Sequence, residues 1–225
     1  MDKKIHIQKK QELKEISSQI NHRITEVFGN YVTELNFSYI DLFTVLFYQQ
    51  MNQKVKEPDW FGRDRLIISN LATLPSLFSV MANLGYVSWK DCRDLVVGFS
   101  KFFTNPNLSL SQYPGVDFIS NSPYIGSIQA LGYSLLGRQA KPGFRVFHVI
   151  SDQRNKAMQE VAVTTAKSKI NNLFTILPGL SMEKRASGFH FWFSMGWQLE
   201  EIRFDGLGFI YDGFNRVERI KNLKQ

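Results

Sequence analysis

The chain is poor in the residues that several classes of site require. Its 225 residues include one cysteine and four histidines. A single cysteine excludes an intramolecular disulfide, and the sequence holds no Cys/His cluster of the kind that binds zinc. No segment approaches the roughly 18 uninterrupted apolar residues that favour a membrane-spanning helix. The first residues lack the apolar core of a secretory signal, so we expect a cytoplasmic protein.

Acidic residues are also few relative to basic ones. The chain has 20 Asp and Glu against 27 Lys and Arg, a formal net charge of +7, which favours anionic partners in general. The basic residues are not concentrated in one element, and no RNA-recognition or zinc-finger motif accompanies them. Solvated helix faces are therefore the expected role of these charges, and nucleic-acid binding is not expected.

The length and a 44% hydrophobic content favour one substantial core, so we predict a single domain over residues 1–225. The most informative segment of that domain is a short apolar run at 146–150, followed at once by Ser151-Asp152-Gln153. A helix-like stretch at 155–169 comes next, and then a second apolar run at 173–177. This pattern predicts a strand, a crossover helix and a parallel strand. Open α/β sheets bind ligands at the carboxyl ends of their strands, where Asp152 would stand.

Similar elements are predicted along the rest of the chain. Apolar periodicity and capping residues indicate helices at 8–28, 36–51, 74–84, 89–100, 122–136 and 209–224, and strands at 65–68 and 198–204. Residues 104–121 read as a long loop, and 138–143 as a turn. This alternation predicts an α/β fold in which helices flank a parallel sheet.

The connector at 58–69, Pro-Asp-Trp-Phe-Gly-Arg-Asp-Arg-Leu-Ile-Ile-Ser, resembles the N-terminal, diphosphate-binding domain of transketolases. The resemblance continues through 77–79, 84–86 and 114–116 to 196–197 and 205–206, and so covers nearly the whole chain. It implies the thiamine diphosphate-binding fold. It also implies an enzyme that transfers two-carbon ketol units between sugars, or performs a related carboligation on a small metabolite.

The resemblance further implies a partner. In that family a separate pyrimidine-binding domain supplies the glutamate that activates the cofactor, and residues 1–225 contain neither that domain nor the C-terminal one. The chain thus looks like the N-terminal-half subunit of a split transketolase. It would work with a C-terminal-half subunit in a hetero-oligomer, a heterotetramer or larger.

Thiamine diphosphate and Mg²⁺ are the cofactors that the resemblance implies. Asp152 matches the Asp of the family's Gly-Asp-Gly motif and would be the metal ligand, since Mg²⁺ prefers oxygen ligands. The flanking glycines, which let the backbone approach phosphates closely, are replaced by Ser151 and Gln153. The family's second metal ligand, an Asn, falls in Pro178-Gly179-Leu180, which offers no side-chain oxygen. The residues assigned to the cofactor site are Ser151, Asp152, Gln153, Arg154, Asn155, Ser122 and Gly126.

Other family motifs have lost their characteristic residues. Asn70-Leu71-Ala72 stands where the family has a Gly-His pair, 122–126 replaces a glycine-rich phosphate motif, and 205–207 reads Asp-Gly-Leu instead of Asp-Gly-His. None of the four histidines falls on a catalytic position of the family. Both His148, inside a predicted strand, and His190, among aromatic residues, are predicted to be packing residues.

Three interpretations remain open. The first is a divergent two-component transketolase-like enzyme. The second is a cofactor-free pseudoenzyme subunit that stabilises or regulates a partner, in which Asp152 is a helix N-cap or turn residue. In the third, Arg154 and Asn155 bind a different phosphorylated ligand, because they would lie at a helix start, where anions bind well.

Overall fold

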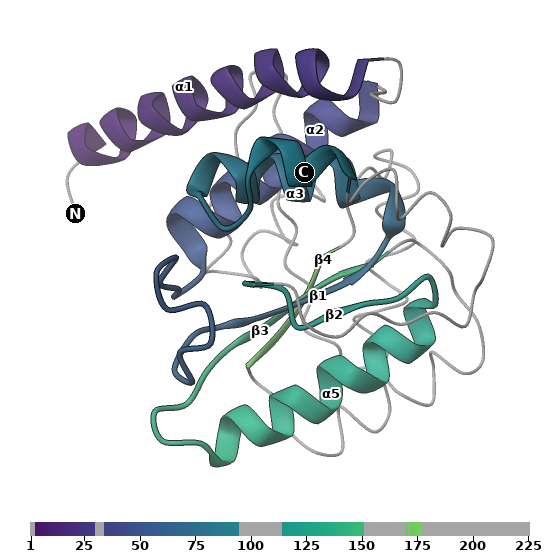
Figure 1. Cartoon of the computed structure of the whole chain (residues 1–225). Coiled ribbons are helices and arrows are strands. Elements are labelled where there is room, and N and C mark those ends of the chain that lie inside the picture. The colour runs from purple at the N-terminus through teal and green to yellow at the C-terminus, as the bar shows by residue number, and fades with distance from the viewer. Residues whose placement is uncertain (1–2, 30–33, 95–113, 151–169, 171, 177–225) are drawn as a thin grey trace, which may run out of the picture.

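A four-stranded parallel sheet lies at the centre of the molecule, with helices on both of its faces (Figure 1). The computed structural model describes residues 3–29, 34–94, 114–150, 170 and 172–176. The strands are β1 (Arg65–Ser69), β2 (Phe118–Ile119), β3 (Val146–Ile150) and β4 (Leu173–Ile176). Their order in the sheet is β2-β1-β3-β4, and every neighbouring pair is parallel. The predicted α/β fold with a parallel sheet is confirmed.

The helices divide unequally between the two faces of the sheet. On one face lie α1 (Lys3–Phe28), α2 (Glu34–Val45), which a π-helix extends over Leu46–Gln50, and α3 (Leu74–Leu84). On the other lies α5 (Pro123–Gln139) (Figure 1). Helix α3 ends as predicted, because Gly85 adopts a φ of 90°, a left-handed conformation that favours glycine.

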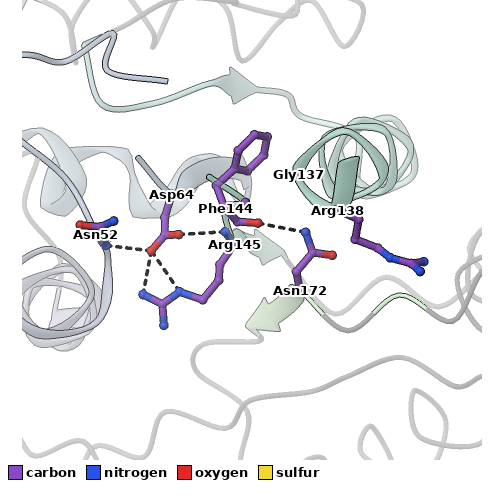
Figure 2. Close-up of a pocket in the computed structure, with 8 residues that line it drawn as sticks. Asn52, Asp64, Gly137, Arg138, Phe144, Arg145 and Asn172 are labelled. Atoms are coloured by element: carbon purple, nitrogen blue, oxygen red, sulfur yellow. Dashed lines mark hydrogen bonds and ion pairs between the residues drawn. The ribbon is translucent and has the colours of Figure 1, made fainter. Parts of the chain in front are cut away.

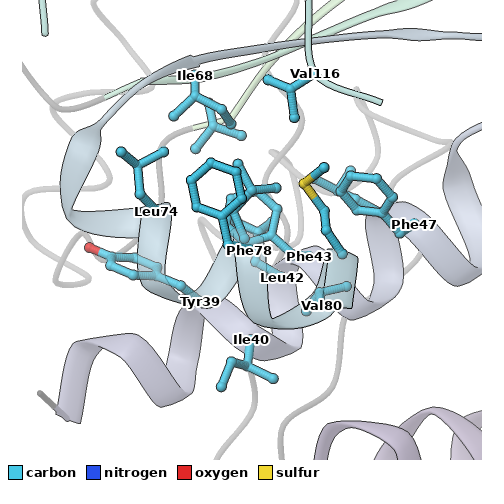
Figure 3. Packing of buried hydrophobic residues seen from close by; sticks show 14 of the residues in the cluster. Tyr39, Ile40, Leu42, Phe43, Phe47, Ile68, Leu74, Phe78, Val80 and Val116 are labelled. Carbon is cyan, nitrogen blue, oxygen red and sulfur yellow. The ribbon is translucent and has the colours of Figure 1, made fainter. Parts of the chain in front are cut away.

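Strand β1 separates two hydrophobic clusters, since successive side chains of a strand point to opposite faces. Leu66 and Ile68 join a large cluster with α1, α2 and α3, in which Phe43 and Phe78 are fully buried (Figure 3). Ile67 joins a smaller cluster on the α5 side. Burial on both faces explains why β1 and β3 are continuous apolar runs, as expected for a parallel sheet covered by helices.

Several predicted boundaries differ from the structure, among them the start of α1, which lies at Lys3 and not at residue 8. The segment 104–121, interpreted as a loop, contains β2, which pairs with β1 at the edge of the sheet. Helix α5 continues to Gln139, into the segment predicted as a turn. Of the helix predicted at 89–100, residues 89–94 are helical and the remainder lies outside the described residues. The predicted elements at 155–169, 198–204 and 209–224 also lie outside them.

Cys92 is buried in that helical segment. Among the residues that the structure describes, we find no helix with the length and apolar character needed to cross a membrane.

Candidate functional site

The strand order indicates that a ligand would bind at the carboxyl ends of β1 and β3. The chain goes from β1 to a neighbour on one side, β2, and then crosses to β3 on the other side. In open α/β sheets, ligands bind where the connections diverge in this way, and the order 2-1-3-4 puts that point between β1 and β3. The polar residues described at this carboxyl edge are Ser69, Asn70, Ser120, Asn121 and Ser122. The predicted site residues 151–155, with the metal ligand Asp152 among them, lie outside the described residues.

A buried hydrogen bond joins the two central strands near this edge. Ser69 Oγ lies 2.8 Å from His148 Nε2, and the two residues are 2% and 0% exposed. Desolvation lowers the pKa of His148 to about 3, because burial disfavours the charged imidazolium. A serine beside a histidine can form a nucleophile and base pair. Here the serine is inaccessible and the imidazole is a weak base, so the pair fastens β1 to β3, as the packing prediction for His148 anticipated.

Gly126, at the start of α5, packs against this hydrogen-bonded pair. A Cβ atom added at Gly126 would lie 1.7 Å from Ser69 Oγ and 2.9 Å from His148 Nε2. Only glycine therefore allows α5 to approach the end of β1 this closely. Gly126, which the sequence assigned to the phosphate site, faces the sheet and packs against Ser69 and His148.

Ser122 begins α5 at the same edge. As the N-cap residue, it accepts a hydrogen bond at its Oγ from the backbone N–H of Ile125, at 3.3 Å. The backbone N–H of Ser122 donates to Ser120 Oγ at 3.0 Å. The N-terminus of a helix carries partial positive charge and favours anions. The start of α5 thus lies at the carboxyl edge, but the Ser122 hydroxyl already accepts a hydrogen bond from its own helix.

The described residues of this edge do not fit a magnesium site. They supply hydroxyls, two amides and a neutral imidazole, whereas Mg²⁺ is usually held through one or two carboxylates. The described segments contain no group of three or more His, Cys, Asp or Glu residues that could bind a metal ion. The carboxylate that the sequence assigns to the metal, Asp152, is not among them.

The opposite, amino edge of the sheet is rich in charge. One polar residue directly precedes each strand: Asp64, Asp117, Arg145 and Asn172 come before β1, β2, β3 and β4. Sequence analysis did not identify this set as a group. The signal was present in Arg63-Asp64-Arg65, a charged triplet at the start of an apolar run.

Asp117 fixes the start of β2 to β1. Its two carboxylate oxygens each accept a 2.8 Å hydrogen bond from Arg63, and the two side chains are only 6% and 9% exposed. Asp117 also accepts from the backbone N–H of Leu66, at 2.9 Å. Arg65 Nε lies 3.6 Å from Asp117 Oδ1. Burial and the nearby positive charge of Arg63 lower the pKa of the Arg65 guanidinium. A bidentate pair of this kind gives directional as well as electrostatic stabilisation.

Asp64 fixes the start of β3 to β1 in the same way (Figure 2). Its carboxylate accepts from the backbone N–H groups of Asn52 and Arg145, and from Nε and Nη2 of Arg145, at 2.7 to 3.1 Å. Asn172 adds the link from β4, donating to the carbonyl oxygens of Phe144 and Ser134 at 3.0 Å. The amino ends of all four strands are therefore joined by side chains.

A hollow of about 600 Å³ opens beside these residues (Figure 2). Its walls are Asn52, Asp64, Gly137, Arg138, Gly143, Phe144, Arg145 and Asn172. It lies at the edge opposite to the predicted cofactor site, and the groups around it serve mainly to connect strands. We therefore place the candidate functional site at the carboxyl edge.

Comparison with known proteins supports the fold. No protein-family model matches the chain, and no curated protein matches it. Among solved structures, transketolase from Leishmania mexicana is similar, with a TM-score of 0.54 and 16% sequence identity over 82% of this chain. The match covers 31% of that transketolase, so the chain spans about a third of its length. At this identity the likeness concerns the fold alone, and the chain has a transketolase-like α/β fold.

Proposed function

We propose that the chain is the N-terminal-half subunit of a two-component transketolase-like enzyme, which performs ketol transfer or a related carboligation with a separate C-terminal-half subunit. The observation that carries the proposal is the strand order β2-β1-β3-β4, with the N-terminus of α5 at the carboxyl edge of the sheet. This is where a parallel sheet of this order binds anionic ligands. The transketolase-like fold supports a role of this kind.

In this proposal the chain binds and orients the cofactor's diphosphate. The helix start at Ser122 would favour the anion, and Asp152, Arg154 and Asn155 would follow β3 at the same edge. At this edge the described residues supply no accessible acid or base, since His148 is buried and bonded to Ser69. Proton transfer would therefore depend on groups from the second subunit, as the resemblance to transketolases implies.

A second candidate is a cofactor-free subunit that stabilises or regulates its partner. Three features favour it: the Ser122 hydroxyl caps its own helix, Ser69 and His148 bond to each other, and the space beside Gly126 is filled. Each removes a polar group or a gap that a diphosphate could use. A variant of the first proposal, in which Arg154 and Asn155 bind another phosphorylated ligand, uses the same edge of the sheet.

Calorimetric titration separates these functions. The full chain is titrated with thiamine diphosphate and Mg²⁺, both alone and co-expressed with a chain carrying the pyrimidine-binding and C-terminal transketolase domains. The enzyme proposal predicts saturable binding in the complex that Asp152→Ala abolishes. The matched control is Asp59→Ala, because Asp59 is an exposed carboxylate on the connector before β1.

Absence of binding in a stable complex would reject thiamine chemistry and support the cofactor-free subunit. Inorganic pyrophosphate, titrated in parallel, tests the remaining alternative. If it binds and thiamine diphosphate does not, the carboxyl edge serves another phosphorylated ligand.

A further inference from the structure

The hollow at the amino edge of the sheet is walled by charged and polar groups that the proposed function does not use (Figure 2). Its volume of about 600 Å³ falls within the range of sites that hold small molecules, roughly 300–1,000 Å³. Every residue of its wall is among those that the structure describes. They come from the connector before β1, the end of α5, the start of β3 and the residue before β4. The hollow is therefore formed where a helix end and several strand starts meet.

Positive charge prevails on this wall. It contains two guanidinium groups, Arg138 and Arg145, and one carboxylate, Asp64. The Asp64 side chain is 3% exposed and accepts four hydrogen bonds, which come from the backbone of Asn52 and from the backbone and side chain of Arg145. The Arg145 side chain is 33% exposed. A molecule in the hollow therefore meets guanidinium groups, because the carboxylate is enclosed by its own hydrogen bonds.

Arg145 retains a hydrogen-bond donor after it has joined the strands. Its Nε and Nη2 donate to Asp64, and Nη2 also donates to the carbonyl oxygen of Gln50. Within the described segments, no acceptor bonds to its third nitrogen, Nη1. These bonds hold the guanidinium in one orientation. Arg138, an exposed residue in the last turn of α5, supplies the second cation. Guanidinium groups bind phosphate oxygens through short, charge-assisted hydrogen bonds.

We propose that this hollow binds a small sugar phosphate, with its phosphate group held by Arg138 and Arg145. A phosphate group carries a charge of about −1.5 to −2 at pH 7, which two guanidinium groups match. The wall also includes the last turn of α5, where backbone carbonyl oxygens lack partners within the helix and can accept hydrogen bonds from sugar hydroxyls. The net charge of +7 attracts such an anion to the chain.

Binding at this place would also stabilise the fold. The two arginines belong to α5 and to the start of β3, so a ligand that contacts both is bound by the folded chain and not by the unfolded one. The melting temperature of the chain therefore reports binding without any assay of activity. The inference goes beyond the proposed function and does not rest on it, because the hollow lies at the opposite edge of the sheet.

Calorimetric titration of the full chain with glucose 6-phosphate tests the inference, with glucose and inorganic phosphate as separate titrants. We expect saturable binding of glucose 6-phosphate, weaker binding of inorganic phosphate and no binding of glucose. Arg138→Gln should weaken the binding of glucose 6-phosphate at least about tenfold, because it removes a hydrogen bond to a charged group. The matched control is Arg93→Gln, which removes an exposed arginine beside Cys92, on the α1–α3 side of the sheet. This control should leave the affinity unchanged.

Asn52→Asp provides a second test that leaves both arginines in place. Asn52 is an exposed residue of the wall, and its bond to Asp64 comes from its backbone N–H, which the substitution keeps. Its side chain makes one 3.4 Å hydrogen bond, to the carbonyl oxygen of Gly62. The added carboxylate repels a phosphate group, so the affinity should fall. The melting temperature without ligand verifies that the variant folds.

Four results would overturn the inference. One is no binding of glucose 6-phosphate by the folded natural chain. Another is the same affinity in the natural chain, Arg138→Gln and Asn52→Asp. The third is binding that Arg154→Gln abolishes and Arg138→Gln leaves intact, which would assign the ligand to the carboxyl edge. The fourth is equal affinity for inorganic phosphate and glucose 6-phosphate, which would reject a sugar phosphate as the ligand. The proposed function is tested separately, by thiamine diphosphate and Asp152→Ala, so the two failures are distinguishable.

Discussion

The two edges of the sheet differ in how their polar groups are used. At the amino edge, charged side chains precede the strands and connect them through Arg63–Asp117 and Asp64–Arg145. At the carboxyl edge the polar groups are hydroxyls, amides and one neutral imidazole, and Ser69 and His148 pack against Gly126. The first edge holds the strands together through ion pairs, and the second is a tight packing contact between α5 and the sheet.

This difference follows from the parallel sheet. All its strands start at the amino edge, so charges placed there can fix the register of several strands at once. They do so without occupying the candidate ligand site, which lies at the carboxyl edge. The carboxyl edge must instead let a helix N-terminus come close to the sheet, which requires small residues. The comparison predicts that the amino edge carries more of the stability. Three experiments test that division.

The largest effect is expected from Asp117→Ala. This change leaves the buried guanidinium groups of Arg63 and Arg65 without their shared carboxylate. Removing one partner from a buried ion pair costs about 3–5 kcal/mol, and we expect a loss of that size in urea unfolding of the full chain. Asp59→Ala, at an exposed carboxylate, should change the unfolding free energy by less than about 0.5 kcal/mol. A similarly small loss for Asp117→Ala would contradict the fastening role of the amino edge.

The next effect is a dependence of stability on pH that arises at the carboxyl edge. The pKa of His148 is lowered to about 3 in the folded chain, against an ordinary value of 6.5. Between these values the unfolded chain binds a proton that the folded chain does not, so His148 favours folding above pH 6.5 and that contribution is lost as the pH falls toward 3. One such proton corresponds to about 1.4 kcal/mol per pH unit.

Unfolding free energies measured from pH 7 to pH 4 check this prediction. His148→Gln should reduce the slope of the unfolding free energy against pH, by up to the amount that corresponds to one bound proton. His22→Gln is the matched control, because it removes an exposed imidazole of α1 and leaves the buried one in place. Equal slopes for the natural chain and His148→Gln would show that the imidazole is not held neutral at this edge.

The smallest effect is expected from Gly126→Ala, which adds one methyl group against Ser69 and His148. Overpacking of a tight contact costs about 1–3 kcal/mol. Ser69→Ala in the same chain removes the oxygen that the new Cβ would meet at 1.7 Å, and should restore part of the loss. Gly132→Ala is the matched control on the same helix. It meets nothing within 4 Å and should stabilise by about 0.5–1 kcal/mol. Equal effects at the two glycines would contradict the close packing of α5 at this edge.

Much of the fold could be predicted from the sequence, because local patterns determine it. The apolar runs at 65–68, 146–150 and 173–177 gave β1, β3 and β4, and Gly85 gave the end of α3. Strand β2 was missed because two residues after a polar, proline-containing stretch carry no periodicity. The predicted cofactor residues were located only in part: Ser122 and Gly126 lie at the carboxyl edge, and Asp152 remains a prediction.

The sequence by itself determined the α/β alternation, the parallel sheet and the helical character of α5, because periodicity and capping act between residues a few positions apart. Tertiary structure alone decided which charges pair, since the Arg63–Asp117 and Asp64–Arg145 contacts join residues 54 and 81 positions apart. It also decided that Ser69 and His148 meet under Gly126. These outcomes depend on the order of the strands and on the close approach of α5 to the sheet, which pattern alone does not determine.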